Sequence, residues 1–198
     1  LTPRTKEGCA GMSMYGTAGG MAGTEFTGDL PIHNWQAGSW QEGAEALSGQ
    51  MIHQSYWVRD THCHACPVGC GKEIAINGGQ YAGVRGEGPE YETLAGFGAM
   101  LEIDDLAAVS RASDLCNRLG LDTISASATI AFAFEAFEHG LISTQGTGGV
   151  ELAWGKPEGM LQMIELIAAR RGAGAVLADG SRAAAAHLGH GADAYAIH

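Results

Sequence analysis

Three cysteines within eight residues constrain this chain more than any other feature of its sequence. They lie in the segment Cys63-His64-Ala65-Cys66-Pro67-Val68-Gly69-Cys70-Gly71. Thiolates separated by two and by three residues, on a loop that contains glycine, can converge on one face of an iron–sulfur cube. Backbone N–H groups of such a loop also point at the sulfurs and offset the negative charge of the cluster. The spacing therefore favours a [4Fe–4S] site, for which this loop offers three of the four ligands.

The same segment admits other interpretations. A structural zinc site would take His62 or His64 as its fourth ligand, although such sites usually draw their ligands from two separated pairs. Unligated thiols are the third interpretation. A secreted disulfide scaffold does not fit, because it would be denser in cysteine and even in number. We therefore expect a reducing cytoplasm, and a fourth cluster ligand that is Cys9, Cys116, a histidine or a residue outside this chain.

The net charge and the lack of a long apolar run exclude several classes of partner. The chain of 198 residues has 11 Lys and Arg against 22 Asp and Glu, a formal net charge of −11. That balance argues against nucleic acid and against an anionic membrane surface as partners. The sequence has no run of 18 apolar residues, so no membrane-spanning helix is expected. The chain begins with Leu1 and stops at His198 within an apolar stretch, and we expect it to be one domain, 1–198, of a longer protein.

Hydrophobic spacing predicts a mostly α fold with one short β-hairpin after the cysteine loop. Asn77-Gly78-Gly79 is a hairpin turn signal between strands expected at 73–76 and 81–84. Residues 1–38 have little periodicity and are expected to be loop, apart from a helical turn at 11–15. The expected helices are 39–56 capped by Ser39 and Glu42, one from Asp104 or Asp105 to 119, the very apolar and central 123–139, one from Pro157 to 171, and 173–187.

Two further segments carry polar groups next to expected helix starts. Gly88-Pro89-Glu90-Tyr91-Glu92-Thr93 places two carboxylates just ahead of a helix, and ordinary helix-start charge would explain them. The run from Asn117 to Thr123 leads from one helix into the next. Its simplest interpretation is a corner with Gly120 as the left-handed end of the first helix and Asp122 or Thr123 as the cap of the second.

Taken together and in this order, these segments resemble the tungsten-containing aldehyde ferredoxin oxidoreductase family. The resemblance covers nearly all of the chain. The cysteine loop followed by Gly-Pro-Glu-Tyr-Glu and then Gly-Leu-Asp-Thr is its most specific part. The matching stretches are Tyr15-Gly16-Thr17-Ala18-Gly19, Leu30-Pro31, Asn34-Trp35-Gln36 with Gly38, the Cys63/Cys66/Cys70 loop, Gly88–Thr93 and Leu115–Ile124.

The resemblance implies a β-rich N-terminal domain followed by two mainly helical domains, with a tungsten (or molybdenum) bis-pterin and a [4Fe–4S] cluster between them. This chain resembles the middle domain, so the β-rich domain and the C-terminal helical domain would be missing from it. The resemblance makes Cys63, Cys66 and Cys70 three cluster ligands and places the fourth in the C-terminal domain. Cys116 matches no ligand position.

The family's pterin-binding pattern, Asp-x-x-Gly-Leu followed by Asp or Cys, matches Asn117, Gly120, Leu121 and Asp122. Asparagine at the first position keeps a hydrogen-bond acceptor but lacks the charge of aspartate. The resemblance implies that Asp122 accepts hydrogen bonds from pterin N–H groups, which a charged acceptor makes stronger.

The implied reaction converts an aldehyde and water into a carboxylic acid, and the cluster passes the two electrons to ferredoxin. Glu92 and then Glu90 are the carboxylates of this chain that could activate water or take the aldehyde-derived proton. The implied partners are ferredoxin, a small aldehyde, the remaining domains of the parent chain and a second copy in a homodimer. The alternatives are a zinc-stabilised, non-catalytic interaction domain and a same-family enzyme for another carbonyl or acyl-CoA substrate. A small iron–sulfur electron carrier would normally show a complete set of four cysteines.

Overall fold

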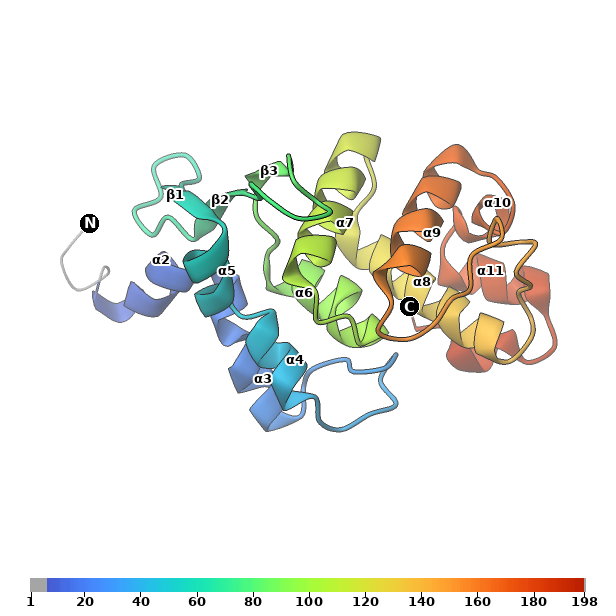
Figure 1. The fold of residues 1–198 in the computed structure, drawn as a ribbon. Helices are drawn as coiled ribbons and strands as arrows, with labels where there is room; N and C mark the ends of the chain where they lie inside the picture. Colours follow the sequence, from blue (N-terminus) through green and yellow to red (C-terminus); the bar gives the residue numbers. More distant parts are fainter. Residues whose placement is uncertain (1–6, 198) are drawn as a thin grey trace.

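Helices form most of the chain in the computed structural model, which describes residues 7–197, and a small antiparallel sheet lies at one end (Figure 1). The mostly α fold class is therefore confirmed. Along the chain the helical elements are α2 (Ala10–Tyr15), η1 (Thr17–Gly20), α3 (Met21–Thr27), α4 (Gln41–Ala46), α5 (Gly49–Ser55), α6 (Tyr91–Phe97), η2 (Ala99–Leu101), α7 (Leu106–Leu119), α8 (Thr123–Glu138), α9 (Pro157–Ala169), α10 (Gly174–Leu177), α11 (Ser181–Leu188) and η3 (Ala192–Tyr195).

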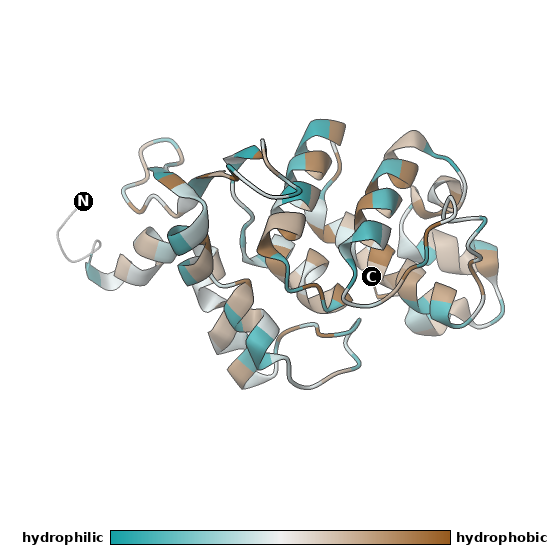
Figure 2. Ribbon diagram, viewed as in Figure 1, coloured by the Kyte–Doolittle hydropathy of each residue, from teal (hydrophilic) through white to brown (hydrophobic). Residues whose placement is uncertain are grey.

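Helix α8 is the centre of the fold, as its apolar sequence predicts. Ten of its residues are buried, and Ile130, Phe132 and Phe134 are fully excluded from solvent. Because α8 is apolar nearly all round, it is covered on several sides, by α6, α7, α9, α10, α11 and η3. By contrast, the ribbons of α7 and α9 alternate between hydrophobic and hydrophilic residues, as expected of helices with one face toward solvent (Figure 2).

Four of the predicted ends of the long helices are confirmed. Asp105 begins α7 by accepting hydrogen bonds from the backbone N–H groups of Ala107 and Ala108. Gly120 ends α7 in the left-handed conformation, with φ of 70°, and two residues later Asp122 caps α8. Pro157 occupies the first turn of α9, where its missing N–H is not needed.

The sheet has one strand more than the predicted hairpin. Strands β1 (Trp57–Thr61), β2 (Gly71–Ala75) and β3 (Arg85–Glu87) pair antiparallel in that order. β1 lies between the helix expected to end at 56 and the cysteine loop, where no strand is predicted. The second hairpin strand is not 81–84, which lies in the connecting turn, but 85–87. The cross-strand pairs of Glu73 with Arg59 and Arg85 help to set this register.

Several local predictions in the N-terminal half are wrong. The helix expected at 39–56 is two helices, because the hydroxyl of Ser48 accepts from the N–H of Met51 and begins α5 there. Ser39 caps no helix; its hydroxyl donates to Glu25 instead. Of the expected loop 1–38, residues 1–6 lie outside the described part. Residues 10–15 are helical as predicted for 11–15, but residues 17–27 are helical as well.

Near the C-terminus the observed helices differ from the predicted ones in two places. Helix α9 ends at Arg170, which takes the left-handed conformation itself, rather than at Gly172. The segment expected as one helix at 173–187 is divided into α10 and α11. No helix in the described range 7–197 is long and apolar enough to cross a membrane.

Helices α6 and α8 approach each other closely because Gly96 has no side chain. A Cβ atom added to Gly96 would lie 2.1 Å from Oγ of Ser127 and 2.7 Å from its Cβ. Apolar residues from the whole described chain, from Ala18 to Ala192, join in one core cluster around this contact.

We predict that Gly96→Ala lowers the free energy of unfolding by about 1–3 kcal/mol, since the two helices must move apart. Gly23→Ala in α3 is the control, because a Cβ there meets nothing within 4 Å. That variant is expected to raise stability by about 0.5–1 kcal/mol through its better helix propensity. Urea unfolding followed by circular dichroism measures both, and equal effects would show that the α6–α8 contact is not tight.

Candidate metal and cofactor site

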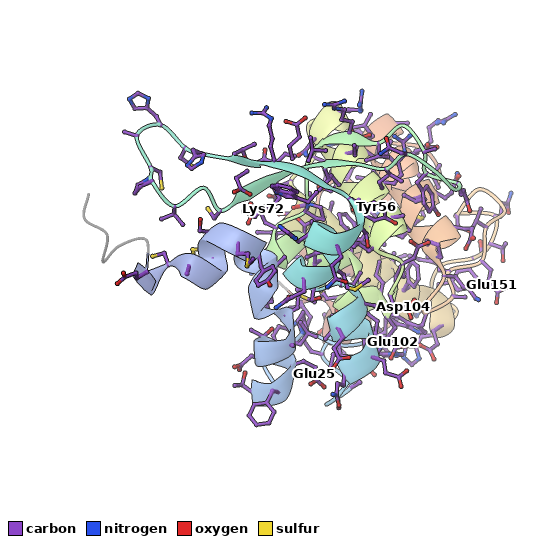
Figure 3. The ribbon with its side chains drawn as sticks, turned by 60° about the vertical axis from the view of Figure 1, so that its left-hand side comes forward. Glu25, Tyr56, Lys72, Glu102, Asp104 and Glu151 are labelled. Carbon is purple, nitrogen blue, oxygen red and sulfur yellow. The ribbon has the colours of Figure 1, made fainter. Side chains whose placement is uncertain are left out.

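The cysteine loop connects β1 to β2 and projects beyond the ends of these strands toward α2 (Figure 3). Cys63 is exposed, Cys66 and Cys70 are half-buried, and all three are free thiols. The N–H of Cys66 donates to the carbonyl of Cys63 over 3.0 Å, which closes a turn between the first two cysteines. Ala65 and Gly69 both have positive φ, a backbone conformation typical of tight turns.

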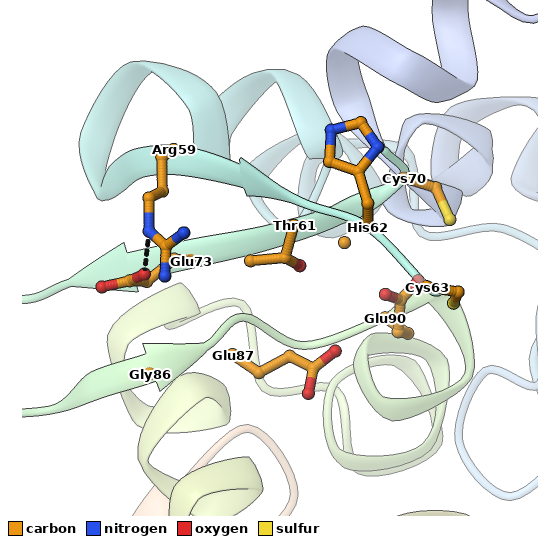
Figure 4. A pocket seen from close by; sticks show the side chains of 10 residues that line it. Arg59, Thr61, His62, Cys63, Cys70, Glu73, Gly86, Glu87 and Glu90 are labelled. Carbon is orange, nitrogen blue, oxygen red and sulfur yellow. Dashed lines mark hydrogen bonds and ion pairs between the residues drawn. The ribbon is translucent and has the colours of Figure 1, made fainter. Parts of the chain in front are cut away.

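A cavity of about 400 Å³ lies beside this loop (Figure 4). Cys63 and Cys70 line it, and Cys66 is not among the lining residues. Within residues 7–197, His, Cys, Asp and Glu side chains nowhere gather in a group of three able to hold a metal ion. The remaining lining residues are Arg59, Thr61, His62, Gly71, Glu73, Gly86, Glu87 and Glu90.

The donor set nevertheless fits an iron–sulfur cluster. Three soft thiolate ligands lie on one glycine-containing loop, and two of them already face the same open cavity. One ring nitrogen of His62, the nitrogen Nδ1, lies 3.0 Å from the carbonyl oxygen of Cys66 and so contacts its own loop. For Cys63, Cys66 and Cys70 to share one cluster, the thiol of Cys66 would also have to face the cavity.

The other two cysteines differ in their surroundings. Cys116 is fully buried on α7, and burial together with the nearby charge of Asp122 raises the pKa of its thiol to about 12. Cys116 packs among apolar core residues and is not among the residues that line the cavity, so it is not placed to be the fourth ligand. Cys9 is half-buried and immediately precedes α2.

Glu90 is held in place at the edge of the cavity. Its carboxylate accepts a short hydrogen bond from the hydroxyl of Thr17, and the same hydroxyl accepts from the N–H of Tyr91 over 2.8 Å. Glu92 lies exposed in the first turn of α6 and is not among the residues that line this cavity. Of the two predicted carboxylates, the structure therefore brings Glu90 to the cysteines. Sequence reasoning missed Thr17, although it lies in one of the matching stretches.

The corner between α7 and α8 is exposed. Oδ2 of Asp122 accepts from the N–H of Ser125 over 2.7 Å, and this backbone hydrogen bond lowers the pKa of the Asp122 carboxyl. Leu121 and Asp122 line a hollow of about 110 Å³. Asn117 instead lines a separate hollow of about 260 Å³ between α7 and β3. The predicted pterin residues thus share one corner but open onto two different hollows.

Tertiary packing joins the two polar motifs that the sequence separates by about 30 residues. The hydroxyls of Thr93 and Thr123 lie 2.9 Å apart, so the starts of α6 and α8 are side by side. Glu87 lines both the 400 Å³ cavity and the hollow that contains Asn117, so these two spaces adjoin. The cysteine loop, Glu90 and Asn117 therefore lie along one continuous surface.

Comparison with known proteins agrees with this arrangement. The family model described as "Aldehyde ferredoxin oxidoreductase, domains 2 & 3" matches residues 2–198. The chain belongs to the aldehyde ferredoxin oxidoreductase family. The resemblance read from the cysteine loop and the two polar motifs is thereby confirmed.

Two relatives in this family are about two fifths identical to this chain. The tungsten-containing aldehyde ferredoxin oxidoreductase of Pyrococcus furiosus is 40% identical over 181 residues, and that of Thermococcus kodakarensis is 38% identical. In both comparisons the match covers 91% of this chain but only 29% of the relative's length. A more distant relative, the WOR-like subunit of aliphatic sulfonate oxidoreductase from Pyrococcus furiosus, is 30% identical over 93% of this chain and 30% of its own length.

A solved structure shares the fold. It is the active-site complex BamBC of benzoyl-coenzyme A reductase with 1,5-dienoyl-CoA, and its TM-score with this chain is 0.72. The match covers 90% of this chain and 27% of the other, at 24% sequence identity. The helical arrangement around α8 is therefore a known architecture.

We predict that Asp122→Ala lowers the free energy of unfolding by about 1 kcal/mol at pH 7, because α8 loses its cap. The folded-state pKa of Asp122 lies below the ordinary value of 3.8. Its contribution to stability is therefore present above the unfolded-state pKa and is lost as the pH falls through the folded-state pKa. Urea unfolding between pH 7 and pH 2 should show the two proteins converging at low pH, and a constant difference would contradict this role for the carboxylate.

Proposed function

We propose that this chain is the middle helical domain of a tungsten (or molybdenum) oxidoreductase that converts an aldehyde and water into a carboxylic acid, two protons and two electrons. One observation carries the proposal. Cysteines of the three-cysteine loop and the anchored carboxylate of Glu90 line one cavity, in a chain 40% identical to a tungsten-containing aldehyde ferredoxin oxidoreductase. The other domains of the parent chain would complete the site.

Cys63, Cys66 and Cys70 would hold three corners of a [4Fe–4S] cluster, and the rest of the parent chain would supply the fourth ligand. When bound, the tungsten bis-pterin would supply two-electron oxidation of the aldehyde, and the cluster would supply single-electron transfer. The protein's part is to hold the thiolates at the cavity and to keep polar groups oriented around it. The exposed position of Cys63 supports this assignment, because a ligand shared with another domain has to be reachable from outside.

Asn117, Gly120, Leu121 and Asp122 would bind the pterin. Asp122 is exposed, and a carboxylate that accepts one cap bond has capacity for further N–H donors. Gly120 turns the chain with φ of 70°, a conformation that side chains disfavour, and so brings Asp122 to the surface at the start of α8. The adjoining hollows at Asn117 and Glu87 connect this corner to the cysteine loop.

Glu92 and Glu90 would handle protons. Glu92 is exposed and free to reach a substrate bound outside this domain, where it would take the aldehyde-derived proton or activate water. Glu90 is held by the hydroxyl of Thr17 and faces the cysteine cavity, so its carboxylate is positioned rather than mobile. Both carboxylates lie at the start of α6, but only Glu90 lines the cysteine cavity.

We propose ferredoxin as the electron acceptor, a small aldehyde as the substrate, the cytoplasm as the location and a homodimer as the assembly. The aldehyde rests on the names of the more similar relatives, which are 37–40% identical, whereas the sulfonate oxidoreductase subunit is 30% identical. The odd number of cysteines, all of them free thiols, supports a reducing compartment.

The cluster assignment predicts that Cys63→Ser, Cys66→Ser and Cys70→Ser in the full-length protein each lower the iron content and the visible absorption. Serine is a poorer ligand for iron than thiolate, so the cluster is lost or incomplete. Cys9→Ser is the control and should keep the wild-type iron content. Anaerobic purification with elemental analysis for W, Mo, Fe and Zn measures this. A colourless wild-type protein with about one zinc per chain would instead establish a structural zinc site.

The proton-transfer assignment predicts that Glu92→Gln lowers turnover of aldehydes by about 10²–10⁴-fold, the usual contribution of a general acid or base. The visible spectrum of the cluster should stay intact, since Glu92 lines no part of the cysteine cavity. Glu90→Gln tests the second carboxylate in the same assay, and Glu42→Gln in the exposed first turn of α4 is the control. Wild-type turnover in Glu92→Gln would remove this residue from the mechanism.

A further inference from the structure

Lys72 is a buried cation at the base of the cysteine loop (Figure 3). It lies on β2, two residues after Cys70, and its side chain is only 6% exposed. Its ammonium group donates to the carbonyl of Gly69 over 3.0 Å, to the carbonyl of Ser13 over 2.6 Å and to Oδ1 of Asp60 over 2.9 Å. An ammonium has three N–H donors, so all of them are used.

The three acceptors come from three separate segments, namely α2, β1 and the cysteine loop. The carbonyl of Gly69 belongs to the peptide that leads directly into Cys70, so the hydrogen bond from Lys72 fixes the backbone at that ligand. The backbone at Gly69 and Cys70 is also closely packed against other residues. A Cβ at Gly69 would lie 2.4 Å from the ring of His62, and a Cβ at Gly16 would lie 2.7 Å from the carbonyl oxygen of Cys70.

The two ends of the loop are therefore held differently. Cys70 is half-buried on a backbone fixed by Lys72 and closely packed glycines, whereas Cys63 is exposed. A ligand on a fixed backbone has less conformational entropy to lose when a metal binds than a ligand on an exposed turn. Cys70 is thus the pre-positioned ligand of the three.

The charge of Lys72 has a second consequence. Burial opposes ionisation of Asp60, yet its hydrogen bonds with Lys72 and Trp57 lower the pKa of the carboxyl on balance, so the two residues form an ion pair. The cavity beside them is lined by the carboxylates of Glu73, Glu87 and Glu90 and by the exposed Arg59. Because interactions of buried charges are screened less than those of exposed ones, the ammonium of Lys72 would act more strongly on a cluster at this loop than Arg59 does.

We propose that Lys72 is a positioning residue for the [4Fe–4S] cluster, an inference that rests on the proposed function. It holds the Gly69–Cys70 peptide so that the Cys70 thiolate faces the cavity. Its buried positive charge also favours the reduced form of the cluster, which carries one more electron, and so raises the reduction potential.

The experiment uses the full-length protein, purified without oxygen, and compares wild type with Lys72→Met, Lys72→Arg and Arg59→Met. Iron per chain and the cluster's midpoint potential, from a redox titration followed by electron paramagnetic resonance, are the readouts. Lys72→Met should lower the ratio of reduced to oxidised cluster about tenfold at a fixed potential, which is a shift of 59 mV for one electron. Lys72→Arg keeps the charge and should restore most of the potential. Arg59→Met removes an exposed cation at the same cavity and should shift the potential much less.

An unchanged or raised potential in Lys72→Met with wild-type iron content would overturn the inference and leave the proposed function standing. Should Lys72→Met hold no cluster, Asp60→Asn decides, because removing the negative partner while keeping Lys72 must raise the potential. An unchanged or lowered potential in Asp60→Asn would likewise overturn the inference. A wild-type protein without iron would instead refute the proposed function itself.

Discussion

The close packing of α6 against α8 determines where the polar groups of this domain lie. Gly96 lets the two helices approach until the hydroxyls of Thr93 and Thr123 meet, and this contact places the start of one helix beside the start of the other. Glu90 immediately precedes the start of α6, Glu92 lies in its first turn, and Asp122 immediately precedes the start of α8. The absence of a side chain at Gly96 thus allows the close contact that brings these two segments together.

The apolar core and the candidate site occupy different parts of the molecule. The interior around α8 is apolar, with Ile130, Phe132 and Phe134 fully buried, whereas the candidate site lies on the surface formed by the sheet and the helix starts. Membership of the aldehyde ferredoxin oxidoreductase family and the match to only 29% of its relatives' length agree with such a surface. A cofactor site shared between domains requires each of them to present its ligands outward, because buried groups could not be completed by a second domain.

The two ends of the cysteine loop differ in how firmly the surrounding residues hold them. Glycines at the Cys70 end allow close backbone contacts, and Lys72 ties that end to α2 and β1. The Cys63 end has no comparable burial and remains exposed. Thr17 plays the corresponding part for Glu90, because its single hydroxyl contacts both the carboxylate and the N–H of Tyr91. Residues from the first 20 positions therefore orient groups that lie 50 to 75 residues later.

By itself, the sequence determined the mostly α fold, the starts of the long helices, the end of α7, the cysteine loop and the family, because these depend on local capping, on hydrophobic period and on motif spacing. Asp105, Gly120, Asp122 and Pro157 act within a few residues of themselves, so their roles were predictable. Only the tertiary structure decided that Ser48 rather than Ser39 begins a helix, that β1 joins the sheet, and that Glu90 rather than Glu92 faces the cysteines. Each of these depends on a partner distant in the chain, such as Glu25 for Ser39, β2 for β1 and Thr17 for Glu90. Spacing along the sequence does not encode such partners, since they become neighbours only when the chain folds.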